Sequence, residues 1–262
     1  MIGLACSSLS CDGFTDNKFV QSIRTLPKIG YRYIELNCWQ PSDLTPNNIG
    51  NMKRRCKESG LEPIAVYGSS FGGIGFDISK DVCHKIRMID AAVELNCHRI
   101  VATGAKKGEQ GGLGTIITVL REIAPYAEER GVLICLENHA NNNLENIEDY
   151  KKIFASIHSP NVGLCIDTGH FDAAGVNLDD VVEELHDRVN HIHIKEAINF
   201  GVEEFVRFGE GVTNNQKLIE QMIQYDYSGY ISVEMALKDK SNIIMDLQKP
   251  FEMFEKYQTQ IQ

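Results

Sequence analysis

Short apolar runs alternate with longer stretches of helical periodicity along the whole chain. The runs are rich in β-branched and other apolar residues, which is typical of strands buried in a parallel sheet. Eight such runs are expected to be strands, at residues 2–8, 31–36, 63–67, 99–103, 133–137, 162–167, 191–194 and 230–234. Their spacing is mostly about 30 residues, the length of one βα unit.

The segments between these runs carry apolar side chains on one face of a helix. In one segment, spacings of three and four residues connect Leu113, Ile116, Ile117, Leu120, Ile123 and Ala127. Apolar residues at this spacing line up on one side of an α-helix and are typical of a helix that packs against a core. Pro125 lies late in that segment, and we expect it to kink or shorten the helix because proline lacks a backbone N–H.

This alternation predicts an α/β protein with a parallel sheet and helices on its outside. Eight units favour a closed single-domain (β/α)8 TIM barrel. An open doubly wound sheet is the alternative on the pattern alone, but no glycine-rich dinucleotide fingerprint follows the first run. No stretch differs enough in composition to mark a second domain, so we expect residues 1–262 to form one barrel.

Charge and hydropathy exclude two classes of partner. The formal net charge is −10, and an acidic surface repels phosphate backbones, so we expect no nucleic acid partner. The basic clusters at 53–55 and 106–107 lack interleaved aromatic residues and are interpreted as solvated charges. Because no apolar run approaches about 20 residues, we expect no membrane span.

Cysteine usage favours a reducing compartment. The eight cysteines form no CxxC pair, and several lie inside apolar runs, as Cys135 does. A free thiol in such a run behaves as a small hydrophobic side chain. The first residues do not resemble a signal peptide, so we expect a cytoplasmic protein.

Four successive predicted strands end in groups that can bind a metal ion. Glu137 ends the fifth run, Asp167 the sixth and Glu234 the eighth, while the seventh contains His191 and His193 on one face. Each residue alone has an ordinary structural explanation, such as capping of the next helix by Asp167. In a closed barrel, however, these strand ends share one rim. Unpaired carboxylates there would repel one another, and a divalent cation removes that repulsion.

The sequence around these residues resembles the xylose isomerase-like barrel superfamily. The matching segments are LENH at 136–139, IDTGH at 166–170, HIHIK at 191–195, GEG at 209–211 and VE at 233–234. The resemblance covers essentially the whole chain and is specific for the superfamily. It is much less specific for the reaction, because the group includes sugar and sugar-phosphate isomerases and epimerases, inosose dehydratases, hydroxypyruvate isomerases and DNA-repair enzymes of the endonuclease IV type.

The resemblance implies one divalent metal ion held by four ligands, which are Glu137, Asp167, His193 and Glu234. Three carboxylates and one imidazole favour Mn2+ or Mg2+, with Co2+, Fe2+ or Zn2+ as further candidates. The resemblance also implies a set of residues that line the substrate pocket. This set comprises His170, Lys195, His139 and Glu35, together with Trp39, which either stacks on a sugar face or packs between a loop and a helix.

The reaction implied is proton abstraction next to a carbonyl. Glu137 and Glu234 match the two metal-bound glutamates that, in epimerases of the superfamily, lie on opposite faces of the substrate carbon. One would remove the proton and the other would return it, which gives an isomerase or epimerase acting on a ketose, sugar phosphate or related keto-polyol. Asn199 stands where the ketose 3-epimerases carry an arginine, and Arg207 is a possible replacement from the following loop. The same groups can eliminate water, so a dehydratase of a cyclic keto-polyol such as an inosose is the alternative.

Two further alternatives receive less support. A nuclease of the endonuclease IV type needs additional histidines, and the ends of the third and fourth runs, at 65–68 and 102–104, contain none. A non-catalytic binding protein has no need for both glutamates. The expected partner is a small sugar or polyol, and the superfamily makes a homo-oligomer a further possibility. The loops 7–14, 37–45 and 68–76 are expected to select the substrate, with phosphate binding by residues 68–75 or by Lys106 and Lys107 left open.

Overall fold

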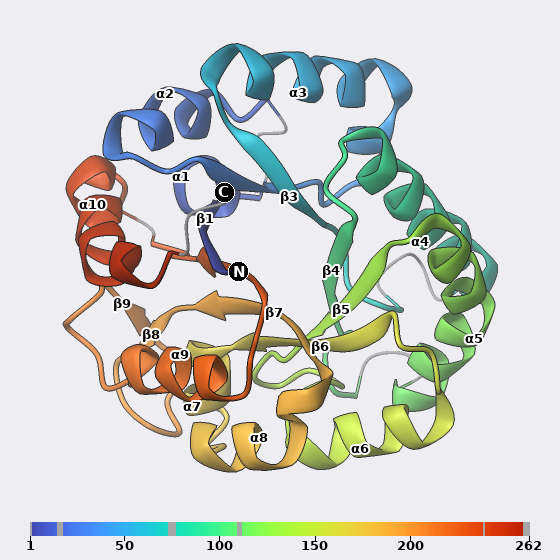
Figure 1. The fold of residues 1–262 in the computed structure, drawn as a ribbon. Coiled ribbons are helices and arrows are strands. Elements are labelled where there is room, and N and C mark those ends of the chain that lie inside the picture. The colour runs from blue at the N-terminus through green and yellow to red at the C-terminus, as the bar shows by residue number, and fades with distance from the viewer. Residues whose placement is uncertain (1, 15–17, 73–76, 109–111, 238, 259–262) are drawn as a thin grey trace.

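A computed structural model describes residues 2–14, 18–72, 77–108, 112–237 and 239–258 of the chain. Its centre is a closed barrel of eight parallel strands (Figure 1). These strands are β1 (Ile2–Ser7), β2 (Tyr33–Asn37), β3 (Glu62–Tyr67), β4 (Arg99–Thr103), β5 (Leu133–Glu137), β6 (Val162–Asp167), β7 (Val189–Ile194) and β10 (Gly229–Val233). The pairing of β1 with both β2 and β10 closes the barrel. The TIM barrel prediction is therefore confirmed, and the doubly wound alternative is wrong.

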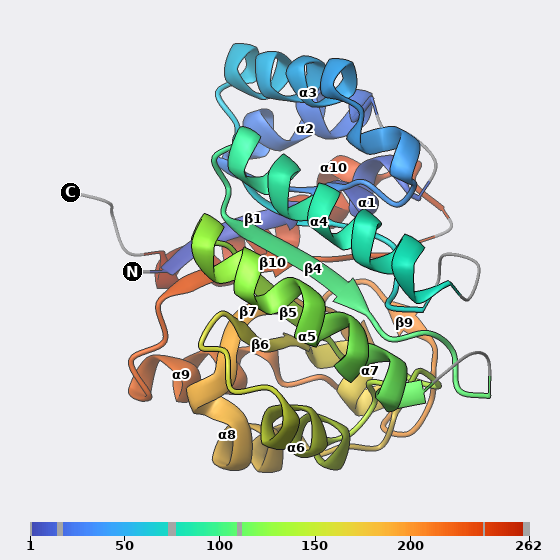
Figure 2. The ribbon, with the colours of Figure 1, turned by 90° about the vertical axis from the view of Figure 1, so that its right-hand side faces the viewer.

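Helices surround the barrel on its outer side (Figure 1). They are α1 (Ser8–Asp12), α2 (Val20–Ile29), α3 (Pro46–Ser59), α4 (Ile78–Glu94), α5 (Gly112–Arg130), α6 (Ile147–Ser156), α7 (Thr168–Ala173), α8 (Leu178–Leu185), α9 (Asn215–Gln224) and α10 (Ile243–Phe254). Short 3-10 turns occupy Pro41–Leu44, His186–Arg188 and Glu255–Tyr257. Figure 2 shows β4 pointing toward the end of the barrel that carries α7 and the loop strands. Those are β8 (Glu196–Ala197) and β9 (Phe205–Val206), which form a small antiparallel sheet.

Helix α5 runs through Pro125 and ends only at Arg130, so the expected shortening is wrong. Proline removes one backbone hydrogen bond from the helix. Packing outweighs this loss, because Ile116, Leu120 and Ile123 are completely buried against the barrel. No helix in the described part of the chain is both long and apolar enough to cross a membrane.

The apolar core has two parts. The larger part lies between the strands and the helices, and a smaller cluster fills the barrel interior with side chains such as Ala5, Val101, Cys135 and Cys165. Because side chains of a strand alternate between its two faces, the residue two positions after an interior residue also points inward. Glu137 and Asp167 follow Cys135 and Cys165 in this way, which directs both carboxylates into the C-terminal mouth of the barrel.

Candidate metal centre

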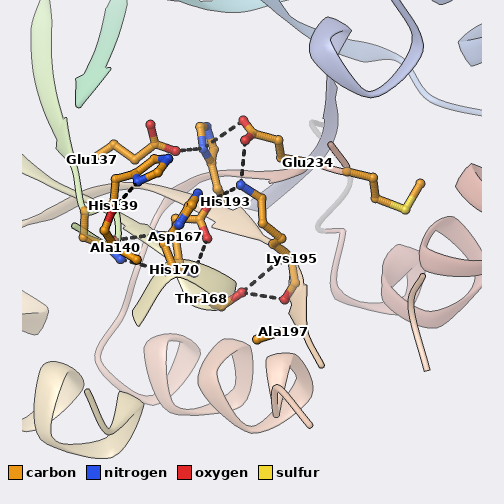
Figure 3. Close-up of polar contacts among 12 residues, drawn as sticks. Glu137, His139, Ala140, Asp167, Thr168, His170, His193, Lys195, Ala197 and Glu234 are labelled. Carbon is orange, nitrogen blue, oxygen red and sulfur yellow. Dashed lines mark hydrogen bonds and ion pairs between the residues drawn. The ribbon is translucent and has the colours of Figure 1, made fainter. Parts of the chain in front are cut away.

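Four potential metal ligands meet at the C-terminal end of the barrel (Figure 3). Glu137, Asp167, His193 and Glu234 each offer one ligand atom, and these atoms all lie within 4.8 Å of one another. The residues come from β5, β6 and β7 and from the position directly after β10, which are neighbours around the barrel. All four side chains are buried. The structure thus brings together the four residues that the sequence analysis selected.

The hydrogen-bonding register of the strands fixes this arrangement. Asp167 is aligned with His193 between β6 and β7, and the backbone N–H of Glu234 donates to the carbonyl of Ile194, 3.1 Å away. Asn138 holds the backbone of Asp167 from the neighbouring strand, since its side chain accepts from the Asp167 N–H at 2.7 Å and donates to the Asp167 carbonyl at 2.9 Å. Asn138 was not among the predicted site residues, although its place directly after Glu137 was a usable signal.

The distances within the cluster are short. Nδ1 of His193 lies 2.6 Å from Oε1 of Glu137 and 3.3 Å from Oε2 of Glu234. The ammonium group of Lys195 lies 2.8 Å from both Asp167 Oδ2 and Glu234 Oε1. Oε2 of Glu137 is buried and accepts no hydrogen bond from the described residues. A buried carboxylate oxygen without a partner is costly, so this donor set fits a divalent cation.

The two glutamates differ in their electrostatic surroundings. Burial raises the pKa of the Glu234 carboxyl to about 7, against the lowering effect of Lys195 and His193. Burial also acts to raise the pKa of Glu137, but His193 and Lys195 hold that pKa below its usual value. Two carboxyl groups with pKa values moved apart are typical of a site that handles protons. Tyr67 contributes to the difference, because its phenol group lies close to Glu137 and favours the ionised carboxylate.

Glu35 lies inside the barrel and orients the histidines. Its Oε2 is 2.9 Å from Nε2 of His191 and 2.9 Å from Nε2 of His193. A carboxylate on the far nitrogen of a metal-binding imidazole fixes the ring and leaves the other nitrogen for the ion. Glu35 has no exposed surface. The assignment of Glu35 to the substrate pocket remains a prediction, and the structure adds that its carboxylate contacts both histidines of β7.

The charge on His193 follows from these neighbours. Burial acts to lower the pKa of its imidazole, but Cys165, Glu35 and Glu137 raise that pKa well above its usual value. Burial likewise opposes ionisation of Lys195, and the nearby carboxylates of Asp167 and Glu234 more than reverse that effect on its pKa. The Lys195 ammonium group thus helps to balance the carboxylates of the cluster.

Two further predicted residues, His170 and His139, lie directly beside the cluster. The backbone N–H of His170 donates to Asp167 Oδ1 at 2.8 Å. Its ring stacks on that of His139, with centroids 3.6 Å apart, and meets Phe205 edge-on at 4.6 Å. Burial and the positive charge of Lys195 lower the pKa of His170 well below its usual value, which keeps the imidazole neutral. Phe205, which the sequence analysis missed, also lies under the Lys195 ammonium group at 5.0 Å.

The glycine of the DTGH segment is required by packing. A Cβ atom at Gly169 would lie only 2.9 Å from Cβ and Cγ of Lys195. Only glycine allows α7 to begin this close to the strand that carries Lys195. The segment therefore places Asp167, His170 and Lys195 in one compact unit.

A cleft of about 510 Å³ lies beside the cluster. Its lining consists of Phe14, Trp39, Tyr67, Ser70, Gly72, Thr103, Gly104, Ala105, Lys106, His139 and Asn142. Tyr67 and His139 link the cleft to the cluster, since the Tyr67 ring lies 5.8 Å from that of His193 and His139 stacks on His170. Trp39 packs edge-on against Phe14 and Tyr67 while lining the cleft. Residues 73–76 of the loop 68–76 lie outside the described residues.

Arg207 does not reach the cluster. Its guanidinium binds Asp246 in α10 at 2.8 Å and lies 3.8 Å from Asp239. Asn199 is exposed on the loop between β8 and β9. The idea that Arg207 replaces the arginine missing at position 199 is therefore wrong.

Comparisons with known proteins agree with this architecture. The family model described as "Xylose isomerase-like TIM barrel" matches residues 23–254. An inosose isomerase of Halalkalibacterium halodurans is 24% identical over 84% of this chain and 83% of its own length. An inosose dehydratase of Histophilus somni is 26% identical over 43% of this chain and 44% of its own length.

Solved structures share the fold at low identity. A D-tagatose 3-epimerase-like protein superposes with a TM-score of 0.76 and 23% identity, covering 97% of this chain and 99% of its own. The 3-keto-D-glucoside 4-epimerase from E. coli gives a TM-score of 0.78 with 18% identity, covering 98% of this chain and 100% of its own. The IOLI protein, solved with a zinc atom, gives 0.79 with 20% identity and the same coverage. At these identities the likeness supports the fold alone.

Proposed function

The chain belongs to the xylose isomerase-like TIM barrel family, and from this premise we propose that it is a divalent-metal-dependent isomerase or epimerase. Its substrate would be a ketose, a sugar phosphate or a related keto-polyol. The observation that carries the proposal is the buried cluster of three carboxylates and one imidazole, in which Glu137 and Glu234 both approach Nδ1 of His193.

One divalent ion would be held by Glu137, Asp167, Nδ1 of His193 and Glu234. Three carboxylates and one imidazole favour Mn2+ or Mg2+, and Co2+, Fe2+ or Zn2+ can use the same donors. When bound, the ion supplies Lewis-acid polarisation of a substrate carbonyl. Glu35 would keep the His193 ring in the orientation that ligation requires.

The protein side chains would carry out the proton transfers. One of the two glutamates, Glu137 or Glu234, takes the proton from the carbon next to the carbonyl, and the other returns a proton from the opposite face. Lys195, which keeps its charge, and the neutral imidazole of His170 hydrogen-bond substrate oxygens and hold the reacting carbon in place. The stacked His139 completes this wall of the pocket.

A dehydratase is the second candidate, since the same base and metal can remove water from a cyclic keto-polyol such as an inosose. Two observations favour it. The chain is similar to inosose dehydratases, one of which is 26% identical over 43% of this chain. In addition, Asp246 holds Arg207 away from the cluster, so the loop supplies no guanidinium of the kind that the ketose 3-epimerase pattern contains.

Product analysis in D2O tests the proposal and separates the two candidates. The protein is stripped with a chelator, reloaded with Mn2+, Mg2+, Co2+ or Zn2+, and incubated with ketoses and inososes under NMR observation. Deuterium entering next to the carbonyl without loss of water supports an isomerase or epimerase. An unsaturated or deoxy product supports the dehydratase. The metal-free protein is the control, and absence of either reaction with every metal would contradict the proposal.

A further inference from the structure

The cleft beside the cluster differs from the rest of the molecule in its charge. Among the described residues that line it, Lys106 carries the only full charge and there is no carboxylate. The whole chain has a formal net charge of −10, so the absence of carboxylates among these described lining residues runs against the average composition. Such a lining favours an anionic group over a neutral one.

Lys106 is presented by a fixed backbone. The β4–α5 loop pairs with the β5–α6 loop, and Lys106 and Asn142 form an isolated bridge between them. Three hydrogen bonds support this bridge, from Asn143 N to Ala105 O at 2.8 Å, from Lys107 N to Asn141 O at 2.8 Å and from Asn142 Nδ2 to Gly104 O at 2.7 Å. A charge carried on a braced loop loses less freedom when it binds a ligand than one on a free loop.

The adjacent lysine differs in one decisive respect. The ammonium group of Lys107 forms an ion pair with Glu145. The ammonium group of Lys106 makes no hydrogen bond or ion pair with any residue that the structure describes, and its side chain is exposed at the cleft. Of the two neighbouring cations, only Lys106 is thus free to bind an incoming anion.

We propose that Lys106 selects substrates that carry a phosphate or carboxylate group remote from the reacting carbonyl. This inference rests on the proposed function and specifies its substrate class. The carbonyl end would face Glu137 and Glu234, while the anionic end would lie in the cleft against Lys106 and the hydroxyl of Ser70. A cleft of about 510 Å³ is within the range of roughly 300–1,000 Å³ of ligand pockets.

Calorimetric titration of the metal-loaded protein tests this assignment. Three probes are compared, namely D-fructose, D-fructose 6-phosphate and 5-keto-D-gluconate, on the unmodified protein and on Lys106→Met and Lys107→Met. Methionine keeps most of the apolar stem while removing the charge. We expect at least one anionic probe to bind the unmodified protein about tenfold more tightly than D-fructose. That preference should disappear in Lys106→Met and persist in Lys107→Met, and the preferred probe identifies phosphate or carboxylate as the recognised group.

The outcomes separate this inference from the proposed function. Metal-dependent binding of D-fructose with no preference for either anion would overturn the role of Lys106 and leave the proposed function intact. Equal losses in both lysine variants would also overturn it, since a general charge effect would then explain the preference. Absence of metal-dependent binding for all three probes would count against the proposed function and remove this inference with it. Thermal unfolding and metal content of each variant serve as folding controls.

Discussion

The two halves of the barrel mouth carry different kinds of side chain. Around one half, β5, β6, β7 and β10 end in or beside the cluster residues Glu137, Asp167, His193 and Glu234. Around the other half, β1 to β4 end in the uncharged residues Ser7, Asn37, Tyr67 and Thr103. The cleft-lining aromatic residues Phe14 and Trp39 come from loops of this second half.

This difference shows that the two halves of the mouth are under different physical constraints. Charged groups buried on one side must be balanced by each other or by a cation, so their positions are tightly determined. The half formed by the ends of β1 to β4 contains, among the described strand residues, no buried charges that must be balanced in this way, apart from Glu35. Its side chains are therefore free to vary in shape and polarity to suit a substrate. Glu35 is the exception, because it belongs to β2 but directs its carboxylate across the barrel to the histidines of β7.

The largest effect on the reaction rate is expected from removing a carboxylate charge in the cluster half, the half of the mouth formed by β5, β6, β7 and β10. Glu137→Gln and Glu234→Gln keep the side-chain shape but remove a base, so we expect the rate of deuterium exchange to fall about 10²- to 10⁴-fold. Each variant is measured at saturating metal, with metal content determined by elemental analysis. Glu148→Gln, at an exposed residue in α6 that pairs with Lys151, is the control and should keep full activity. Unchanged exchange in either cluster variant would remove that glutamate from the mechanism.

A smaller effect, on metal affinity, is expected from substituting Glu35. Glu35→Gln removes the negative charge behind His193, and such outer contacts typically contribute 10- to 100-fold to metal affinity or activity. We expect the metal dissociation constant, measured by competition with a fluorescent chelator, to rise within this range. Glu62→Gln changes an exposed carboxylate on the neighbouring β3 that binds Arg32, and it should leave the metal affinity unchanged. Equal metal affinities of Glu35→Gln and the unmodified protein would confine Glu35 to barrel packing.

The smallest effect, on substrate binding, is expected in the cleft half, the half of the mouth formed by β1 to β4. Trp39→Ala removes an aromatic surface that packs against Phe14 and Tyr67, and an aromatic contact of this kind is worth about three- to tenfold in binding. We expect KM to rise by that factor while kcat and metal affinity stay the same, with Trp39→Phe closer to the unmodified protein. A fall in kcat at constant KM would instead show that Trp39 affects the reaction step, as the cluster residues are expected to do. That result would contradict the proposed separation between the two halves.

The barrel itself was predictable from the sequence because it depends on local patterns repeated at a regular spacing. The runs 99–103, 133–137 and 162–167 coincide with β4, β5 and β6, and the other strands differ by only a few residues. The meeting of Glu137, Asp167, His193 and Glu234 follows from that topology, since the C-terminal ends of parallel strands share one rim. Its assignment as a metal centre remains a prediction.

Other features depend on which distant side chains meet, and local patterns do not contain that information. Arg207 finds its partner Asp246 39 positions later, on another helix. Glu35 finds His191 and His193 across the barrel, more than 150 positions away. The continuation of α5 through Pro125 likewise depends on packing against the barrel, which outweighs the local preference of proline.

The pairing of β1 with β10 has a consequence for the order in which the molecule forms. Glu234 lies directly after β10, the strand that joins the first strand and closes the barrel. During synthesis from the N-terminus, Glu137, Asp167 and His193 all leave the ribosome before this residue does. A nascent chain therefore cannot complete the four-residue cluster until β10 is available to close the barrel, so closure of the barrel and assembly of the cluster depend on the same segment.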